Sequence, residues 1–202
     1  MYFVRIPKIL TLPFPDLVWK VESNQIALTF DDGPHPQSTA LLLQLLEEAQ
    51  CKSTHFLLGK NCLEFHKDFQ LLQFSSHSIG HHTFSHLDAW TSDAEIYFED
   101  FVKAKNIIGN NIFRPPYGKI NPSLINRMKK EFPDIKICQF NLMPGDFDEK
   151  VDAKILKERM YQAKGGDIIV LHDRPECFVK YAPFLKEWIG DISKKGFSFV
   201  TL

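Results

Sequence analysis

Short apolar runs alternate with amphipathic segments along most of the chain. The first run, Ile26–Phe30, contains no alternating polar positions and is typical of a strand buried on both faces. The segment that follows has Leu41, Leu42, Leu45 and Leu46 at helical spacing. The same alternation of strand and helix patterns continues to the C-terminus. It predicts about seven strands and about six helices, with no internal repeat.

The other elements follow from the same patterns and from local stop and start signals. Strands are predicted at 26–30, 54–58, 78–82, 111–114, 136–140, 167–171 and 197–201. Helices are predicted at 38–50, 62–72, 92–108, 121–131, 152–164 and 178–194. The sequence Ser92-Asp93-Ala94-Glu95 matches a capping box, and Asn121-Pro122 places an N-cap before a proline at the first helical position.

Alternating strands and helices favour right-handed crossovers and a parallel sheet. A doubly wound sheet is the general expectation, but no GxGxxG follows the first strand, so nothing supports a dinucleotide site. Polar residues instead follow the carboxyl ends of successive strands: Asp31, Asp32, His82, Arg114, Asp146 and His172. In a barrel these ends meet at one mouth. Because the chain is short for an eightfold barrel, we expect an α/β fold with a distorted or incomplete (β/α) barrel of about seven parallel strands.

Composition narrows the possible partners. The chain has 202 residues, of which 44% are hydrophobic, and a formal net charge of -1, which fits one globular domain. Its Lys and Arg residues are scattered, which argues against nucleic acid and anionic membranes as main partners. The four cysteines lack CxxC spacing and are expected to be free thiols. No signal peptide or membrane-spanning segment is recognised, so the sequence indicates a cytoplasmic protein.

Two adjacent carboxylates, Asp31 and Asp32, follow the first strand and precede the turn Gly33-Pro34. Side chains on a strand point to opposite faces, so the two acids would normally diverge. Where the strand breaks into a turn, both can reach one site, one as a metal ligand and the other as a base. An ordinary surface turn is the alternative.

The segment His82-Thr83-Phe84-Ser85-His86 spaces two imidazoles at i, i+4. If this segment is helical, both rings lie on one face and can bind a single ion. Two histidines and one aspartate leave coordination positions open, as in a catalytic site. The same ligands suit a non-haem iron oxygenase, but those sites usually lie in jelly rolls, which the strand–helix alternation disfavours. The remaining histidines are expected to be structural or exposed: His35, His55, His66, His77 and His81.

Two further segments carry polar residues after strands. Arg114-Pro115-Pro116-Tyr117-Gly118 is either a plain proline turn with a surface arginine or a rigid turn whose arginine pairs with a carboxylate. His172 follows the buried run Val170-Leu171, and alone it would indicate little.

Together these segments resemble one family, the polysaccharide deacetylases, which carry the NodB-homology domain of carbohydrate esterase family four. The resemblance rests on TFDDGP, HTFSH, RPPYG and VLH, which occur in the family's order and at compatible spacing. It covers Ile26–Leu202 and implies a catalytic domain at 26–202. Residues 1–25 are then an N-terminal extension, which we expect to pack on the barrel.

The resemblance implies a divalent ion, most often zinc, held by Asp32, His82 and His86, and makes Asp31 the general base. A metal can lower the pKa of water from about 16 toward roughly 7. An aspartate with an ordinary pKa of about 4 is then an adequate base. Activation of the attacking water, the first step of amide hydrolysis, therefore has candidate residues.

The resemblance also assigns the remaining roles. Arg114 would orient Asp31, the Tyr117 backbone N–H would help to stabilise the oxyanion, and His172 would protonate the leaving amine. Asp146 would tune Arg114 or His172. The family's fourth motif is altered around Asp146, because Met143 replaces its first acid and Phe occupies both of its aromatic positions, Phe140 and Phe147.

The expected function is a metal-dependent hydrolase that removes N-acetyl groups from a carbohydrate, with an N-acetylglucosamine-containing glycan as partner. Hydrolysis of another carbon–nitrogen bond, in a cyclic imide or ureide, is an alternative, and a non-catalytic glycan-binding module is a third. Aromatic side chains near the mouth could stack on sugar rings or belong to the core: Phe84, Trp90, Tyr117 and Phe147. Family members often act at the cell envelope or outside the cell, which conflicts with the absence of a recognised export signal.

Overall fold

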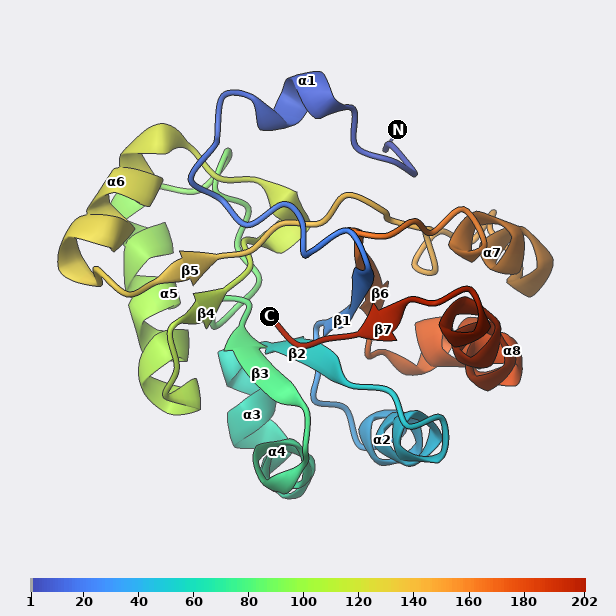
Figure 1. Ribbon diagram of the computed structural model, residues 1–202. Coiled ribbons are helices and arrows are strands. Elements are labelled where there is room, and N and C mark those ends of the chain that lie inside the picture. Colours follow the sequence, from blue (N-terminus) through green and yellow to red (C-terminus); the bar gives the residue numbers. More distant parts are fainter. Residues whose placement is uncertain (1) are drawn as a thin grey trace.

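Seven strands form one curled parallel sheet, with helices arranged around its outer side (Figure 1). The computed structural model describes residues 2–202. The strands are β1 (Gln25–Asp31), β2 (Ser53–Leu57), β3 (Ser78–His81), β4 (Ile112–Phe113), β5 (Lys136–Ile137), β6 (Ile168–His172) and β7 (Ser198–Phe199). Their order is β5-β4-β3-β2-β1-β6, and β7 pairs with the beginning of β1. The predicted distorted (β/α) barrel is confirmed.

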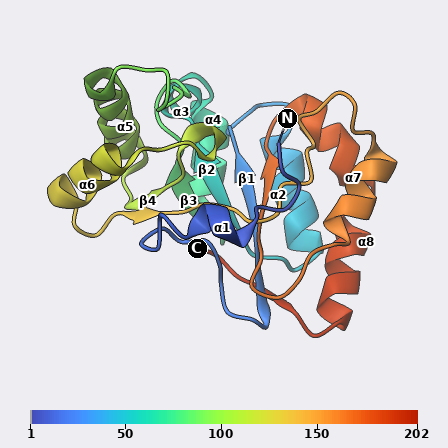
Figure 2. The same cartoon turned by 90° about the horizontal axis from the view of Figure 1, so that it is seen from above.

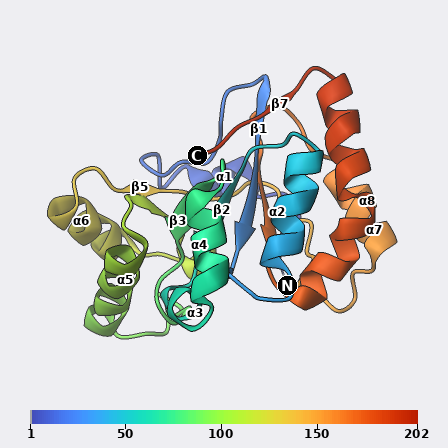
Figure 3. The same ribbon diagram turned by 90° about the horizontal axis from the view of Figure 1, so that it is seen from below.

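The helices that connect the strands cover the outside of the sheet. They are α2 (Thr39–Glu48), α3 (Gly59–Glu64), α4 (His66–Phe74), α5 (Ala94–Ile108), α6 (Pro122–Glu131), α7 (Ala153–Met160) and α8 (Pro175–Lys194). A further short helix, α1 (Lys8–Thr11), lies across the strands in the view of Figure 2. Figure 3 shows α4, α2 and α8 side by side. Loops, rather than these helices, surround the carboxyl ends of the strands.

Two helix predictions are wrong in detail. The single helix expected at 62–72 is two helices, α3 and α4, because Phe65 between them leaves the helical conformation (φ -110°, ψ 55°). The cap of α5 is Asp93 rather than Ser92, since the Asp93 carboxylate accepts from the N–H groups of Glu95 and Ile96. The predicted N-cap of α6 is confirmed, because the Asn121 side chain accepts from the Leu124 N–H.

The side of the barrel between β5 and β6 is closed by irregular chain. The segment after β5 reaches β6 through a single bridge between Leu142 and Ile169. The N-terminal segment runs along the same side and forms bridges from Val18 to Cys138 and from Arg5 to Leu142. In Figure 1 it passes with α1 across the part of the ring between α6 and α7. This closure makes the barrel asymmetric.

Strand register brings the polar strand ends to one edge. Asp31 at the end of β1 lies opposite His172 of β6 on one side and Phe56 of β2 on the other. Farther along the sheet, His81 of β3 lies opposite Phe113 of β4. Because neighbouring strands end together, the residues that follow them meet at one mouth.

The core consists of several packed clusters, and the largest surrounds β1, β6, α2 and α8 with Trp188 fully buried. All four cysteines are buried free thiols, as predicted: Cys51, Cys62, Cys138 and Cys177. Within residues 2–202, none of the helices combines the length and apolar character needed to cross a bilayer.

Candidate active site

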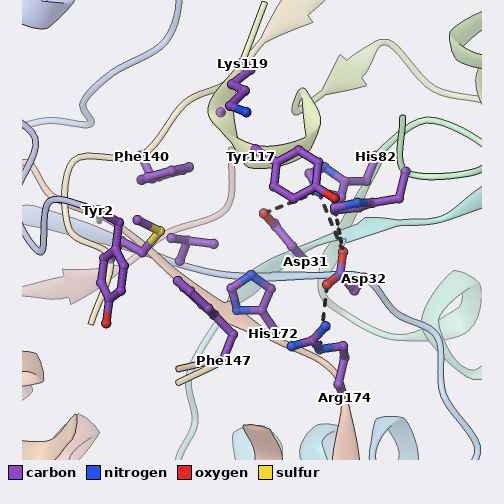
Figure 4. A pocket seen from close by; sticks show the side chains of 14 residues that line it. Tyr2, Asp31, Asp32, His82, Tyr117, Lys119, Phe140, Phe147, His172 and Arg174 are labelled. Carbon is purple, nitrogen blue, oxygen red and sulfur yellow. Dashed lines mark ion pairs between the residues drawn. The ribbon is translucent and has the colours of Figure 1, made fainter. Parts of the chain in front are cut away.

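Asp31 and Asp32 reach one site because the chain turns between them. Asp31 is the last residue of β1, whereas Asp32 adopts a left-handed backbone conformation (φ 74°). The Asp32 N–H donates to the Phe56 carbonyl at 3.1 Å, and the Asn61 amide donates to the Asp32 carbonyl at 2.8 Å. These bonds fix the turn, so both carboxylates lie on the same side of the pocket (Figure 4).

Asp32, His82 and His86 form a group that could hold a metal ion. Asp32 Oδ1 lies 3.7 Å from His82 Nε2 and 3.3 Å from His86 Nε2, and the candidate ligand atoms of the group lie within 4.8 Å of one another. Asp32 Oδ1 is buried without a hydrogen-bond partner. A buried carboxylate oxygen without a partner is costly, and a cation between it and the two imidazoles would satisfy it. These residues therefore fit the predicted divalent ion.

Electrostatics at Asp32 agree with an anionic ligand. Burial alone would raise the pKa of Asp32, but His86, His172 and His82 together lower it below its ordinary value. Burial also lowers the pKa of His82 to about 4. The ionised carboxylate and the neutral His82 are the protonation states in which these groups bind metal.

The segment from His82 to His86 is not helical, so the geometry expected from the i, i+4 spacing is wrong. Thr83 and His86 both adopt left-handed backbone conformations (φ 64° each), and the chain bends sharply there. The two rings nevertheless meet, with centroids 5.1 Å apart. His82 Nδ1 lies 2.7 Å from the Arg114 carbonyl, which can only accept, so Nδ1 carries the hydrogen and Nε2 faces the site as an acceptor.

Arg114 holds Asp31 from beneath the site. Its Nη1 donates to Asp31 Oδ1 at 2.8 Å and to Thr29 Oγ1 at 2.6 Å, and the side chain is fully buried. The guanidinium carbon lies 4.1 Å from the centroid of the Phe56 ring. This ion pair occupies one carboxylate oxygen of Asp31. The other oxygen, Oδ2, lies 3.8 Å from His82 Nε2.

Asp146 contacts His172. The carboxylate Oδ1 lies 2.9 Å from His172 Nδ1, and Oδ2 accepts from the His172 backbone N–H at 2.7 Å. Burial alone would lower the pKa of His172, but the Asp146 carboxylate outweighs it and raises the pKa to about 9. Of the two partners expected for Asp146, the structure therefore brings it to His172.

Tyr117 lies at the rim of the site. It adopts a left-handed backbone conformation (φ 59°) within a short 3-10 turn, η1 (Pro116–Gly118), and its side chain is 60% exposed. Its ring meets the His86 ring edge-on at 4.6 Å. Trp90 is also exposed, and the Lys119 ammonium lies 5.2 Å from its ring centroid and 5.3 Å from that of Tyr117. Phe84 is partly buried.

Most of the candidate site residues line one cavity of about 380 Å³. Its polar side carries Asp31, Asp32 and the two histidines of the candidate metal group, and His172 lies beside them (Figure 4). Its other side is apolar and is formed by Tyr2, Phe140, Met143, Phe147 and Val170. The arrangement places the Asp31 carboxyl group, the His172 imidazole and a candidate metal group in one pocket.

The family model for polysaccharide deacetylases matches residues 20–131, which is more than half of the chain. The chain belongs to the polysaccharide deacetylase family. It is therefore a hydrolase of the polysaccharide deacetylase type, which acts on carbon–nitrogen bonds other than peptide bonds. This confirms the resemblance found in the sequence motifs.

Similar proteins span most of the chain. A peptidoglycan-N-acetylglucosamine deacetylase of Bacillus cereus is 29% identical over 193 residues, which cover 92% of this chain and 91% of that protein. A chitooligosaccharide deacetylase of Azorhizobium caulinodans is 29% identical over 163 residues, covering 76% and 77%. The crystal structure of the Bc1960 peptidoglycan N-acetylglucosamine deacetylase superposes with a TM-score of 0.87 at 26% identity and covers 97% of this chain and 94% of that one.

Sequence reasoning missed two residues of this deacetylase that follow His172. The buried Asp173 carboxylate accepts from Ser38 Oγ at 2.6 Å and from Thr39 Oγ1 at 2.5 Å, and its backbone N–H donates to the Asp31 carbonyl at 2.8 Å. Arg174 Nε lies 3.8 Å from Asp32 Oδ2. Both follow the end of β6, the position that singled out the other site residues, so the same rule could have found them.

Tyr2 was also missed. It belongs to the N-terminal segment, which carries none of the family's motifs, yet it lines the cavity. No pattern in the sequence connects residue 2 with the strand ends.

Proposed function

We propose that this polysaccharide deacetylase removes N-acetyl groups from an N-acetylglucosamine-containing glycan. The observation that carries the proposal is that Asp31, His172 and the group Asp32, His82 and His86 line one cavity. Hydrolysis of an unactivated amide needs a base for water, an acid for the amine and stabilisation of the oxyanion. The cavity offers a candidate for each.

In the proposed mechanism, Asp32, His82 and His86 hold the divalent ion, for which zinc is the family's usual choice. When bound, such an ion polarises water and the amide carbonyl. Asp31 takes the proton of the attacking water through Oδ2, because Arg114 already occupies Oδ1. The Tyr117 backbone N–H is assigned to the developing oxyanion.

His172 donates the proton that the leaving amine requires. A bond forms between the water oxygen and the carbonyl carbon, and the carbon–nitrogen bond breaks as the nitrogen takes the His172 proton. Asp146 supports this role because it keeps His172 protonated at neutral pH, with a pKa of about 9. The products are acetate and the free amine, and solvent exchange returns the protons to their starting positions.

The exposed rings of Trp90 and Tyr117 are the proposed contacts for neighbouring sugar rings. Tyr117 lines the pocket, and Trp90 lies beside Lys119, which lines the pocket as well. The apolar face of a sugar stacks on aromatic rings in such positions.

Acetate release tests the proposal. We expect the purified protein with zinc to release acetate from chitin oligomers or peptidoglycan fragments, and a chelator to abolish the release. If the metal-bound protein releases no acetate from any N-acetylated glycan, the proposed substrate class is wrong. Turnover of a cyclic imide or ureide in that case would favour the alternative hydrolase.

Asp31→Asn separates the roles of the two acids. The variant should keep its metal while turnover falls by about 10²–10⁴, the usual contribution of a general base. Asp32→Asn should instead lose the metal. Metal content is measured by elemental analysis after dialysis. Loss of metal from Asp31→Asn alone would contradict the assignment.

A further inference from the structure

The N-terminal segment supplies one wall of the catalytic pocket. Tyr2 lines the same cavity as Asp31 and His172. In Figure 4 its ring lies beside Phe147, on the other side of the pocket from Asp31 and Asp32. None of the motifs that identify the family includes this segment.

Two aromatic contacts connect Tyr2 to the proposed acid. The Tyr2 and Phe147 rings are tilted by 55° with centroids 5.1 Å apart. Phe147 in turn meets the His172 ring edge-on at 5.3 Å. Tyr2 therefore packs against the ring that contacts the His172 imidazole.

The Tyr2 hydroxyl binds the loop at residues 144–148, which carries Asp146. It donates to Asp148 Oδ2 at 3.1 Å and accepts from Arg159 Nη1 at 3.0 Å. Gly145 adopts a left-handed conformation (φ 93°), and a Cβ at this position would collide with the Tyr2 hydroxyl oxygen. The glycine thus leaves the space that the hydroxyl fills.

The backbone on either side of this contact is also fixed. The Met143 N–H donates to the Val4 carbonyl at 2.8 Å. Arg5 donates to both carboxylate oxygens of Asp167, at 2.9 and 2.8 Å. A charge-assisted bidentate pair of this kind gives both strength and geometric specificity. Tyr2 is therefore held against the pocket by several independent contacts.

The apolar character of this side of the pocket indicates which part of the substrate it contacts. The acyl chain is the part of an N-acylated sugar that has no polar atom beyond its carbonyl, so it gains most from an apolar wall. The hydroxyl groups of the sugar are better placed toward the polar rim. We infer that Tyr2 closes the apolar side of the pocket and limits the size of the acyl group that the site accepts. This inference rests on the proposed deacetylation.

The test compares Tyr2→Ala with Tyr2→Phe, and uses Phe3→Ala as the matched control because Phe3 is 56% exposed. Each protein is assayed on N-acetyl chitotriose and on its N-butanoyl analogue. Tyr2→Ala should raise the ratio of kcat/KM for butanoyl over acetyl by about tenfold or more, the usual effect of methylene groups in an apolar pocket. Tyr2→Phe and Phe3→Ala should keep the wild-type ratio. An unchanged ratio in Tyr2→Ala, or an equal loss on both substrates, overturns the inference.

Amide hydrogen exchange tests the contact of Tyr2 with residues 144–148 without requiring turnover of a substrate. Residues 144–148 should exchange faster in Tyr2→Ala and Tyr2→Phe than in Phe3→Ala, because both lose the hydroxyl bonds. Equal exchange in all three variants overturns the inference. Failure of the wild-type protein to release any acetate would instead refute the proposed function, and the exchange rates would still decide whether Tyr2 holds the loop.

Discussion

One charged residue holds each of the two proposed proton-transfer groups. Arg114 donates to Asp31 Oδ1 inside the core, which leaves Oδ2 as the free oxygen of that carboxylate. Asp146 lies against His172 Nδ1 and raises the pKa of His172 to about 9. The proposed proton acceptor and proton donor therefore have separate partners within one pocket.

Removal of the Asp146 charge should change the pH dependence of turnover. Because the folded pKa of His172 is raised to about 9, its acid form persists at neutral pH and is lost only as the pH rises through that value. In Asp146→Asn, burial still lowers the pKa, so the alkaline limb of kcat should move toward neutral pH. At a pH above the pKa, each unit by which the pKa falls lowers the protonated fraction of His172 about tenfold.

The measurement is kcat against pH for acetate release, with Glu149→Gln as the control because Glu149 is exposed on the same loop. The control should keep the wild-type profile. An Asp146→Asn profile with an unchanged alkaline limb would show that another group, rather than His172, supplies the proton.

Elements are joined by a buried cation as well as by apolar packing. Arg114 follows β4, contacts Thr29 and Asp31 of β1, and donates through Nη2 to the Gln139 carbonyl after β5 at 3.1 Å. One side chain therefore connects three parts of the sheet. Its loss would leave the Asp31 carboxylate buried without its partner.

Arg114→Met should destabilise the fold by about 3–5 kcal/mol, the usual cost of removing one partner of a buried pair. Urea unfolding followed by circular dichroism measures this change. Arg127→Met is the control, because Arg127 pairs with Glu95 on the surface and should contribute little. Equal stability of Arg114→Met and wild type would contradict the role assigned to the buried pair.

The start of α5 offers a second test at this scale. Asp93→Ala should cost about 1 kcal/mol of stability, because its carboxylate caps two N–H groups of the first turn. Ser92→Ala should have almost no effect. The same unfolding experiment compares the stability of the two variants. A larger loss of stability in Ser92→Ala than in Asp93→Ala would instead support the capping box predicted from the sequence.

Local patterns determined which elements could be predicted. The run Ile26–Phe30 is contiguous and apolar, so β1 was recognisable, and Asn121-Pro122 marked the start of α6 by a direct cap. The bend between His82 and His86 depends on left-handed conformations at Thr83 and His86, which no residue type there signals. The sequence indicated that the two rings belong together but not how the chain brings them together.

At the scale of the whole molecule, the site depends on contacts between distant parts of the chain. The strand ends could be predicted because a barrel brings all of them to one mouth. Tyr2 could not, since its contact with Asp148 joins residues 146 positions apart and follows no repeating geometry. The same holds for the Arg5–Asp167 pair, which fastens the N-terminal segment over the irregular side of the barrel.

The four buried thiols allow local opening of the fold to be measured chemically. Burial raises the pKa of Cys51, Cys62 and Cys177 to about 12 and that of Cys138 to about 11, so none forms much thiolate at pH 8. Alkylation by a thiol reagent then requires local opening. The chain therefore carries four chemical reporters within its interior, two of them in the largest cluster.

Mass spectrometry of pulse-alkylated protein should find Cys62 modified before Cys51 and Cys177. Cys62 belongs to the small cluster under α3 and α4, whereas the other two lie in the largest cluster. Modification of Cys51 and Cys177 first would mean that the large cluster opens more easily than the small one. The order of labelling thus ranks the local opening free energies of an unmodified enzyme, with no probe introduced.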